Sequence, residues 1–338
     1  MIPYAVTVVV AAPVSWLLTA LARRYAALRQ MMDVPNPRSS HTHATLRGGG
    51  VSIAVTILLG VALAGLAGWI PVRAAIGFDG GCLAVAVIGW LDDHSSRPAL
   101  LRVLVHAGAA TWAVAWLGGY GRLTVGSISV SLGPPGPILA VLGIAWATNL
   151  YNFMDGIDGI AATEGVAVGV FGGALLASAG EPGLALVCFV VAASSAGFLP
   201  WNWSPARIFM GDVGAGVLGF SFATLAMASE NAGGPPVVLW VLLLGVFVFD
   251  STVTLTRRVL RGERWYAAHR SHAYQRAVSS GWTHAAVSRT VALLSVGLGG
   301  LAVLATAKPE LTGVALLLGG VVLAAVYLLV ERAMPMGG

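Results

Sequence analysis

The feature that most constrains this chain is a series of long apolar stretches that recurs from end to end. A helix needs about 20 mostly apolar residues to cross a hydrocarbon core of ~30 Å. Only 10% of the residues are charged, against roughly 25% in soluble proteins. We therefore predict one integral-membrane domain over residues 1–338, an all-α polytopic membrane protein with about eleven transmembrane helices. The predicted spans are 3–22, 50–70, 74–91, 100–117, 136–154, 158–178, 182–200, 213–229, 235–256, 290–306 and 311–330.

The basic residues predict how the chain crosses the membrane. With the N-terminus outside, only Arg73, Arg122 and Lys308 of the 19 Lys and Arg residues fall in outer loops, and the other 16 are inside. Basic residues gather in cytoplasmic loops, so this split predicts an outer N-terminus and an inner C-terminus. It also explains the net charge of +5 without a nucleic-acid partner. Alternating apolar residues in the outer loop 118–135 suggest a small hairpin.

Neither cysteine suits redox or metal chemistry. Cys82 and Cys188 both lie within apolar stretches, and there is no CxxC motif. We therefore expect no disulfide framework and no thiolate metal site.

Aspartates gather on the predicted inner face. Five of them lie at inner span ends or in inner loops, namely Asp92, Asp93, Asp155, Asp158 and Asp212. One such aspartate is usually a solvated helix cap. Five together, beside conspicuous Asn and Gly residues, indicate a shared site. The active face is predicted to comprise the inner loops 23–49, 92–99, 155–158, 201–212 and 257–289.

The adjacent pair Asp92 and Asp93 closes the third predicted span. Neighbouring carboxylates repel each other unless a cation lies beside them, so the pair suits Mg²⁺ or a phosphate held through that metal. Neighbours on a helix point about 100° apart, which favours different roles for the two.

A polar series follows the fifth span, with Asn149, Asn152, Asp155 and Asp158 at steps of three residues. One ideal helix would not aim all four at a single point, because each step turns the side chain by some 60°. The glycines after each aspartate supply a break and let a ligand approach the backbone. Asn and Asp side chains there can read the donors and acceptors of a nucleoside.

The eighth span begins with Asp212 amid glycines, after Asn202 and Phe209. A carboxylate at a helix start can take a hard cation, and a diphosphate can bind the free N–H groups of the same turn. Phe209 is either a base-stacking ring or an ordinary core or lipid-facing residue.

The last long inner loop, 257–289, contains His269, Arg270 and His272. This combination offers permanent and titratable positive charge for phosphates. The alternative is a positive-inside loop with incidental histidines.

Together these features indicate phosphoryl transfer between a cytosolic nucleotide and a lipid, carried by positioning and charge neutralisation. A polytopic lipid or small-molecule transporter is the alternative, although transporters usually place their charges near the bilayer midplane. A CDP-alcohol phosphotransferase is a third possibility. Its Asp-Gly-x-x-Ala-Arg pattern is missing, because Asp158-Gly-Ile-Ala-Ala lacks the arginine.

At these residues the sequence resembles the polyprenyl-phosphate N-acetylhexosamine-1-phosphate transferase family, also called glycosyl transferase family 4. The matching segments are Leu-Asp92-Asp93, Asn149-x-x-Asn152-x-x-Asp155-Gly-Ile-Asp158-Gly, Phe209-Met-Gly-Asp212 and the loop around His272. Pro35-Asn-Pro-Arg38-Ser-Ser-His41 followed by Arg47-Gly-Gly-Gly50 is similar to the family's first inner loop.

The resemblance implies transfer of a sugar 1-phosphate from a UDP-N-acetylhexosamine to undecaprenyl phosphate, with release of UMP. This Mg²⁺-dependent or Mn²⁺-dependent phospho-sugar transferase would start a cell-surface polysaccharide, O-antigen or wall glycan, at the cytoplasmic face of a bacterial inner membrane. Its partners would be the UDP-sugar, undecaprenyl phosphate and membrane lipid, and a second copy of the chain is a candidate partner.

Residue roles follow from the same resemblance. Asp92, Asp93 and His272 would be catalytic, and Asp212 with Asp93 would hold the metal. Nucleotide contacts would come from Asn149, Asn152, Asp155, Asp158, Asn202 and Phe209. Phosphate and sugar groups would be bound by Arg38, His41, His269 and Arg270.

The sequence departs from the family pattern in three places, and one of them is Gly-Ala-Gly in place of the common Gly-Ser after Asp212. A lysine is common soon after the aspartate pair, and here the nearby base is Arg97. The usual His-x-His-His run is reduced to His272-Ala-Tyr274-Gln275, a form similar to the O-antigen-initiating branch. Asp79, Glu164 and Asp250 have no assigned role and are expected to be structural partners. The donor sugar is left open.

Overall fold

The protein is almost entirely helical in the computed structural model, which describes residues 2–35, 39–263 and 269–336. The longer helices are α1 (Ile2–Leu28), α2 (Val51–Leu66), α3 (Val72–His94), α4 (Ala99–Leu117), α5 (Pro135–Met154), α6 (Ile160–Ser178), α7 (Pro182–Asn202), α8 (Gly211–Ala232), α10 (Gly245–Leu260), α12 (His284–Ala307) and α13 (Thr312–Ala333). The shorter ones are α9 (Val237–Leu243), α11 (Ala273–Ser279) and the 3₁₀ turn η1 (Pro309–Leu311).

Every one of the eleven predicted apolar stretches is helical, but they are not eleven continuous spans. Within the residues that the structure describes, nine helical segments are long and apolar enough to cross a membrane. The stretch 235–256 is instead two helices, α9 and α10, which meet at an angle of 85°. The helix α2 has only 16 residues, short of the about 20 that a perpendicular crossing needs. The prediction of an all-α polytopic protein is confirmed, and the described part of the chain contains nine to ten candidate full-length spans.

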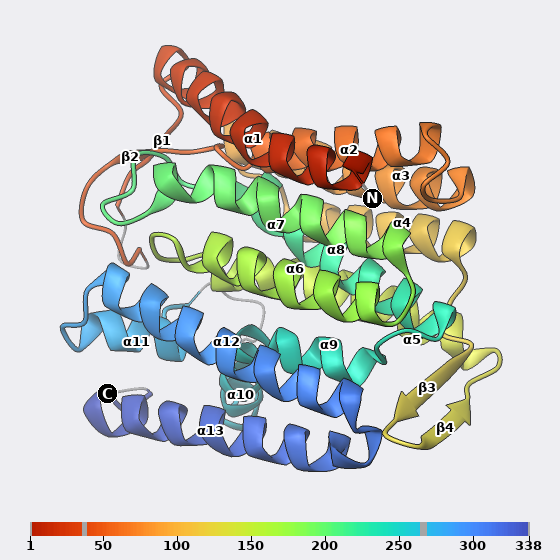
Figure 1. Ribbon diagram of the computed structural model, residues 1–338. Helices are drawn as coiled ribbons and strands as arrows, with labels where there is room; N and C mark the ends of the chain where they lie inside the picture. The colour runs from red at the N-terminus through yellow and green to blue at the C-terminus, as the bar shows by residue number, and fades with distance from the viewer. Residues whose placement is uncertain (1, 36–38, 264–268, 337–338) are drawn as a thin grey trace.

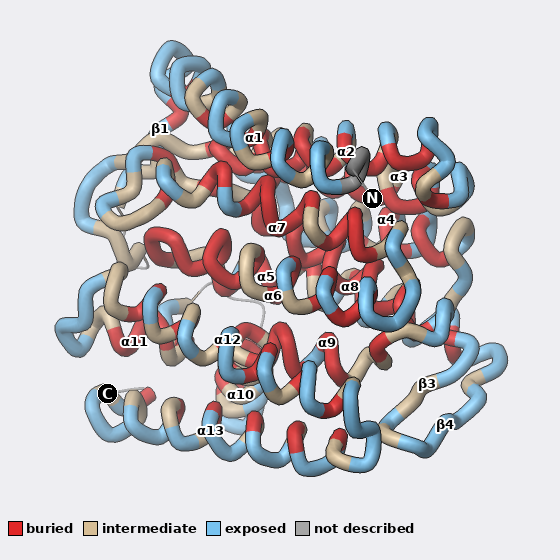
Figure 2. Tube along the Cα trace, viewed as in Figure 1, coloured by how far each residue is buried: buried red, intermediate tan, exposed pale blue. Residues whose placement is uncertain are grey.

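The helices lie side by side in one bundle (Figure 1). The first turn of α1 and the last turn of α13 lie toward opposite ends of the bundle, and the side of the membrane that each faces stays a prediction. The helix α8 runs through the middle and is buried along most of its length, whereas α1 and α13 expose one side (Figure 2). Gly residues along α8 permit this central position, because they let neighbouring backbones approach closely.

Two short antiparallel strand pairs lie at opposite ends of the bundle (Figure 1). The strands β3 (Arg122–Val125) and β4 (Ile128–Ser131) pair antiparallel, which confirms the hairpin predicted in loop 118–135. The strands β1 (Met32–Asp33) and β2 (Thr45–Leu46) pair antiparallel at the other end, next to the C-terminal end of α1.

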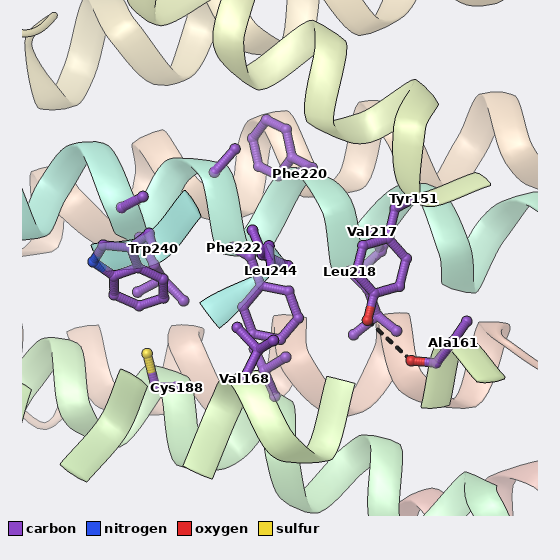
Figure 3. Close-up of a cluster of buried hydrophobic side chains, with 14 of the residues drawn as sticks. Tyr151, Ala161, Val168, Cys188, Val217, Leu218, Phe220, Phe222, Trp240 and Leu244 are labelled. Carbon is purple, nitrogen blue, oxygen red and sulfur yellow. Dashed lines mark hydrogen bonds between the residues drawn. The ribbon is translucent and has the colours of Figure 1, made fainter. Parts of the chain in front are cut away.

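Aromatic and aliphatic side chains of α5, α6, α8 and α9 form the centre of the core (Figure 3). Tyr151 is fully buried there, and its hydroxyl donates a hydrogen bond of 2.9 Å to the carbonyl oxygen of Ala161. This bond ties α5 to α6 on either side of the loop that joins them (Figure 3). The core therefore holds in place the polar loop that carries Asp155 and Asp158.

Candidate active site

Three aspartates from two helices converge at one end of the bundle. Asp92 and Asp93 lie in the last turn of α3, and Asp212 lies in the first turn of α8. The backbone N–H of Asp212 donates a hydrogen bond of 3.0 Å to Oδ1 of Asp93. The first N–H groups of a helix have no partner within it, so Asp93 caps α8. Gly211 has a φ of 74°, and a Cβ there would overlap the Asp93 carboxylate, which explains the glycine.

Two arginines bridge these three carboxylates. Arg47 places Nε 2.7 Å from Oδ1 of Asp93 and Nη2 2.6 Å from Oδ1 of Asp212. Arg102, on α4, places Nη1 2.7 Å from Oδ2 of Asp212 and 3.2 Å from Oδ2 of Asp92. Burial lowers the pKa of Arg47, but the charges of Asp93 and Asp212 outweigh it and raise that pKa above its usual value. Two guanidinium groups are thus shared among three carboxyl groups.

Backbone pairing brings Arg47 to the start of α8. The N–H of Phe209 donates to the carbonyl of Leu46 at 2.8 Å, and the N–H of Gly49 donates back to the carbonyl of Phe209 at 2.9 Å. A Cβ on Gly50 would lie 2.5 Å from the Cα of Gly214. The glycines after Arg47 therefore allow two backbones to touch, and this contact directs the arginine toward Asp93 and Asp212.

The loop between α5 and α6 forms the second part of the site. Gly159 has a φ of 77°, a left-handed conformation that favours glycine, and its N–H donates to Oδ1 of Asn202 at 3.0 Å. The amide nitrogen of Asn202 donates in turn to the carbonyl of Ile208 at 3.0 Å. Asn202 thus joins the 155–159 loop to the segment that precedes α8, with both ends of its side chain already engaged.

Asp158 has fixed partners that sequence reasoning missed. Its Oδ1 lies 3.3 Å from Nδ1 of His284, and its Oδ2 accepts the N–H of Ala206 at 3.2 Å. Nε2 of His284 lies 3.0 Å from the carbonyl oxygen of Ser40. Burial raises the pKa of Asp158, but hydrogen bonds and charge from His284 and Ala206 outweigh it and leave the pKa below its usual value.

Asp155 is in a different electrostatic environment. Burial raises its pKa to about 7, Arg47 opposes the rise, and the charges of Asp212 and Asp93 add to it. Two aspartates three residues apart are therefore expected to differ in protonation when no ligand is bound.

A polar cavity of about 230 Å³ lies between the loop and the carboxylate cluster. Its walls include five of the six residues predicted to contact a nucleotide, which are Asn152, Asp155, Asp158, Asn202 and Phe209. His41, Arg47, Asp212, Gln275 and His284 also line it. The ring of His41 packs edge-on against that of Phe209 with centroids 4.9 Å apart. Asn149 is absent from the described lining, and its amide nitrogen donates to the carbonyl of Ala145 at 2.7 Å.

The residues predicted from the last inner loop lie beside this cavity rather than in its described lining. His272 precedes α11 and places Nδ1 3.4 Å from Oδ1 of Asp250. Asp250 also accepts the backbone N–H groups of Ala273 at 2.8 Å and Tyr274 at 3.2 Å. The sequence predicts Asp250 to be a structural partner, and the structure confirms this, because its carboxylate holds the start of α11.

The other two predicted residues of this loop make local contacts. Arg270 is exposed and donates a hydrogen bond of 2.6 Å to Ser279. The ring of His269 lies 4.8 Å from that of His272. Arg38, predicted to bind phosphate, lies outside the described residues.

Comparison with known proteins adds to this geometry. Residues 75–230 match the sequence model of glycosyl transferase family 4. The chain is 31% identical over 278 residues to a probable undecaprenyl-phosphate N-acetylglucosaminyl 1-phosphate transferase of Bacillus subtilis, an alignment that covers 79% of this chain and 75% of that protein. The chain belongs to glycosyl transferase family 4.

Other family members are similar over comparable lengths. A decaprenyl-phosphate N-acetylglucosaminephosphotransferase of Mycobacterium leprae is 29% identical over 93% of this chain and 86% of its own. A phospho-N-acetylmuramoyl-pentapeptide-transferase of Synechococcus elongatus is 32% identical over 70% of this chain and 66% of its own.

The guanidinium that contacts Asp92 in this family 4 chain does not come from the arginine nearest in sequence. Arg97 contributes its backbone N–H to Oδ1 of Asp92 at 2.6 Å, whereas the guanidinium beside Oδ2 of Asp92 belongs to Arg102. The crossing of α3 and α4 decides this, because it turns the first turn of α4 toward α8. A signal was present in the sequence: Arg102 and His106 share one face of an otherwise apolar helix, and ionisable residues in such helices usually serve a site.

Proposed function

We propose that this protein transfers N-acetylhexosamine 1-phosphate from a UDP-sugar to undecaprenyl or a related polyprenyl phosphate and releases UMP. The observation that carries the proposal is the carboxylate cluster of Asp92, Asp93 and Asp212 at the edge of a cavity lined by Asn152, Asp155 and other predicted nucleotide contacts. Membership of a family whose related proteins are named as such transferases supports it. No relative considered is named as a transporter, so the enzyme is favoured over transport.

The reaction exchanges one diphosphate bond for another. An oxygen of the acceptor phosphate forms a bond to the phosphorus that carries the sugar, and the bond from that phosphorus to UMP breaks. Asp92 and Asp93 would orient the acceptor phosphate, and the 155–159 loop with Phe209 would hold the nucleotide. Once their guanidinium groups move away from the carboxylates, Arg47 and Arg102 would neutralise negative charge on the phosphates of the two substrates. Catalysis then depends on positioning and charge, as is usual for phosphoryl transfer.

A divalent cation fits the donors at this site. Carboxylate oxygens are the ligands that Mg²⁺ prefers, and Oδ2 of Asp93 is buried without a hydrogen-bond partner among the described residues. The described His, Cys, Asp and Glu side chains do not form a group of three already arranged around a metal, and the two arginines occupy oxygens of Asp93 and Asp212 that a cation would use. Asp212 and Asp93 would hold Mg²⁺ or Mn²⁺ after at least one guanidinium contact opens. The bound cation would screen the negative charge of the diphosphate.

The proposed location follows from the same features. The multi-pass helical bundle and the bacterial relatives support a bacterial plasma membrane, and the excess of inner basic residues supports a cytoplasmic active site. The product would begin a cell-surface polysaccharide. His272, Arg270 and His269 would support the site from the adjoining loop.

The test is UMP release by purified protein given undecaprenyl phosphate and a panel of UDP-N-acetylhexosamines. UMP should form only with Mg²⁺ or Mn²⁺, and mass spectrometry of the lipid product would identify the sugar. No UMP from any such donor, with protein shown to be folded, would overturn the proposal.

A further inference from the structure

The hairpin of β3 and β4 has one apolar face and one polar face. Its strands pair in a fixed register, Arg122 with Ser131, Leu123 with Val130, Thr124 with Ser129 and Val125 with Ile128. Paired residues lie on the same side of a sheet, and successive residues alternate between its sides. One side of the hairpin, its apolar face, therefore carries the aliphatic side chains of Leu123, Val125, Ile128 and Val130. The other side, its polar face, carries only arginine, threonine and serine.

The rest of the described chain leaves most of the apolar face uncovered. Ile128 is 68% exposed and Val130 is 57% exposed, and Val125 is exposed as well. Leu123 is half-buried and packs against the core, on the strand that contacts α8 and α9. Figure 2 shows β4 exposed along its length. A contiguous group of aliphatic side chains that is open to the surroundings usually contacts a partner or a membrane.

Both ends of the hairpin are held against the ends of long helices. A Cβ on Gly126, in the turn, would lie 3.0 Å from the carbonyl oxygen of Pro309 and 3.8 Å from Cβ of Thr312, the first residue of α13. At the other end the N–H of Leu132 donates to the carbonyl oxygen of Gly121 at 3.1 Å, just before α5 begins. The hairpin therefore runs between the first turns of α5 and α13, at the end of the bundle opposite β1 and β2 (Figure 1).

The surface next to the hairpin on both sides is lipid-facing. Ile138 near the start of α5, and Val314 and Leu317 near the start of α13, are exposed aliphatic residues on helices long and apolar enough to cross a membrane. Trp112 and Trp116 lie in the last two turns of α4, which precedes β3. Tryptophan is favoured where the hydrocarbon meets the lipid headgroups. These residues place the hairpin at that depth, where its apolar face continues the lipid-facing surface.

We propose that the apolar face of this hairpin is a lipid-contact surface, with Val125, Ile128 and Val130 among the upper acyl chains and the polar face toward headgroups and water. Burial in the acyl chains removes aliphatic surface from water. The free edges of a two-stranded sheet carry backbone polar groups that hydrocarbon cannot satisfy, and headgroups and water satisfy them at this depth. The hairpin thereby anchors the starts of α5 and α13 at the membrane surface.

A protein partner fits this face less well than lipid. The strand β4 has only four residues, and a short edge strand disfavours pairing with another chain. A stable protein interface takes about 800 Å² from each partner, which is more than four partly covered aliphatic side chains supply. Lipid needs neither a matching strand nor a large complementary patch.

Fluorescent labelling of introduced cysteines tests the contact residue by residue. Ile128→Cys and Val130→Cys place a thiol on the apolar face, and the matched controls Ser129→Cys and Ser131→Cys place one on the polar face of the same strand. The two native cysteines are fully buried, so a thiol-reactive fluorophore labels the introduced residue first. Each labelled full-length protein is placed in phosphatidylcholine nanodiscs, and Leu317→Cys on the exposed side of α13 gives the scale for lipid contact.

Two quenchers read the surroundings of each label. Fluorescence at positions 128 and 130 should be lost to a nitroxide at the top of the acyl chains and protected from iodide in the water, and positions 129 and 131 should show the reverse. Successive strand residues face opposite sides, so both patterns should alternate with a period of two residues. Equal iodide quenching at all four positions would overturn the proposal. Protection of positions 128 and 130 from both quenchers would also overturn it, because a protein would then cover the face.

A matched pair of charged variants tests whether the contact stabilises the protein. Ile128→Asp should lower the thermal unfolding midpoint in the same nanodiscs, because a carboxylate is costly among acyl chains. Ser129→Asp should leave the midpoint unchanged. The two positions are adjacent and both exposed, so a general effect of aspartate on the strand would appear in both variants. Equal midpoints for the two variants would contradict the lipid contact.

Discussion

Replacing Arg102 with glutamine is expected to tighten the binding of a divalent cation while slowing turnover. In the described structure one nitrogen of Arg102 lies 2.7 Å from Asp212 and 3.2 Å from Asp92. The proposed metal ligands are Asp212 and Asp93, so the guanidinium and the metal compete for the Asp212 carboxylate. Removing the guanidinium removes the competitor, but it also removes a positive charge that the phosphates need.

The size of the effect follows from the geometry. A unit charge and a divalent ion about 4 to 5 Å apart repel by about 2 kcal/mol at the dielectric constant of water, and by more in a less polar setting. The Arg102 side chain is 29% exposed, so the effective dielectric constant between the guanidinium and the cation should be close to that of water. A change of about 2 kcal/mol corresponds to roughly tenfold to thirtyfold tighter binding. The loss of transition-state charge stabilisation should lower kcat/KM by about 100-fold.

Titration of Mn²⁺ by electron paramagnetic resonance on purified protein measures the cation affinity directly. Arg257→Gln is the control, because Arg257 pairs with Glu331 at 2.6 Å with a similar exposure of 28% and is absent from the described cavity lining. It should leave the Kd for Mn²⁺ unchanged. An unchanged or weaker Mn²⁺ affinity in Arg102→Gln, or an equal shift in both variants, would refute the competition.

Three further outcomes are expected. Asp212→Asn should abolish UMP release with the thermal unfolding midpoint within a few degrees of wild type, and retained turnover would exclude Asp212 as a metal ligand. Gly159→Ala puts a Cβ 3.2 Å from the Trp203 ring at a φ of 77° and should cost about 1 to 2 kcal/mol of stability, measured by unfolding in detergent, with Gly180→Ala as the open-space control at a similar φ. Because the folded-state pKa of Asp155 is raised to about 7 from 3.8, its carboxyl favours folding at low pH and that benefit is lost as pH rises toward 7. Asp155→Asn should therefore raise Tm relative to wild type more at about pH 8 than at about pH 5 in metal-free buffer, and an equal change at both would contradict the shift.

Much of the secondary structure follows from local pattern. Each predicted apolar stretch is helical, because a run of apolar residues in lipid must satisfy its backbone polar groups internally. The break after Met154 was also predicted, since glycines interrupt the Asn and Asp series there. The bend between α9 and α10 was not predicted, because both helices are apolar and together have the length of one span.

The site residues likewise fall into those that the sequence predicted and those that it did not. Sequence spacing identified carboxylates that do gather at one end of the bundle, and five of the six predicted nucleotide contacts line one cavity. Their roles are predictions that the variants above test. Arg47, Arg102 and His284 were passed over, because inner-face basic residues are expected for topology alone.

The sequence by itself determined that this chain is a helical membrane bundle with acidic residues at one face, because both properties depend on the order of apolar and charged residues along the chain. Only the tertiary structure decided which arginines meet the aspartates and that His284 holds Asp158. Those contacts join segments far apart in the chain, and helix crossing angles and glycine-permitted backbone contacts bring them together.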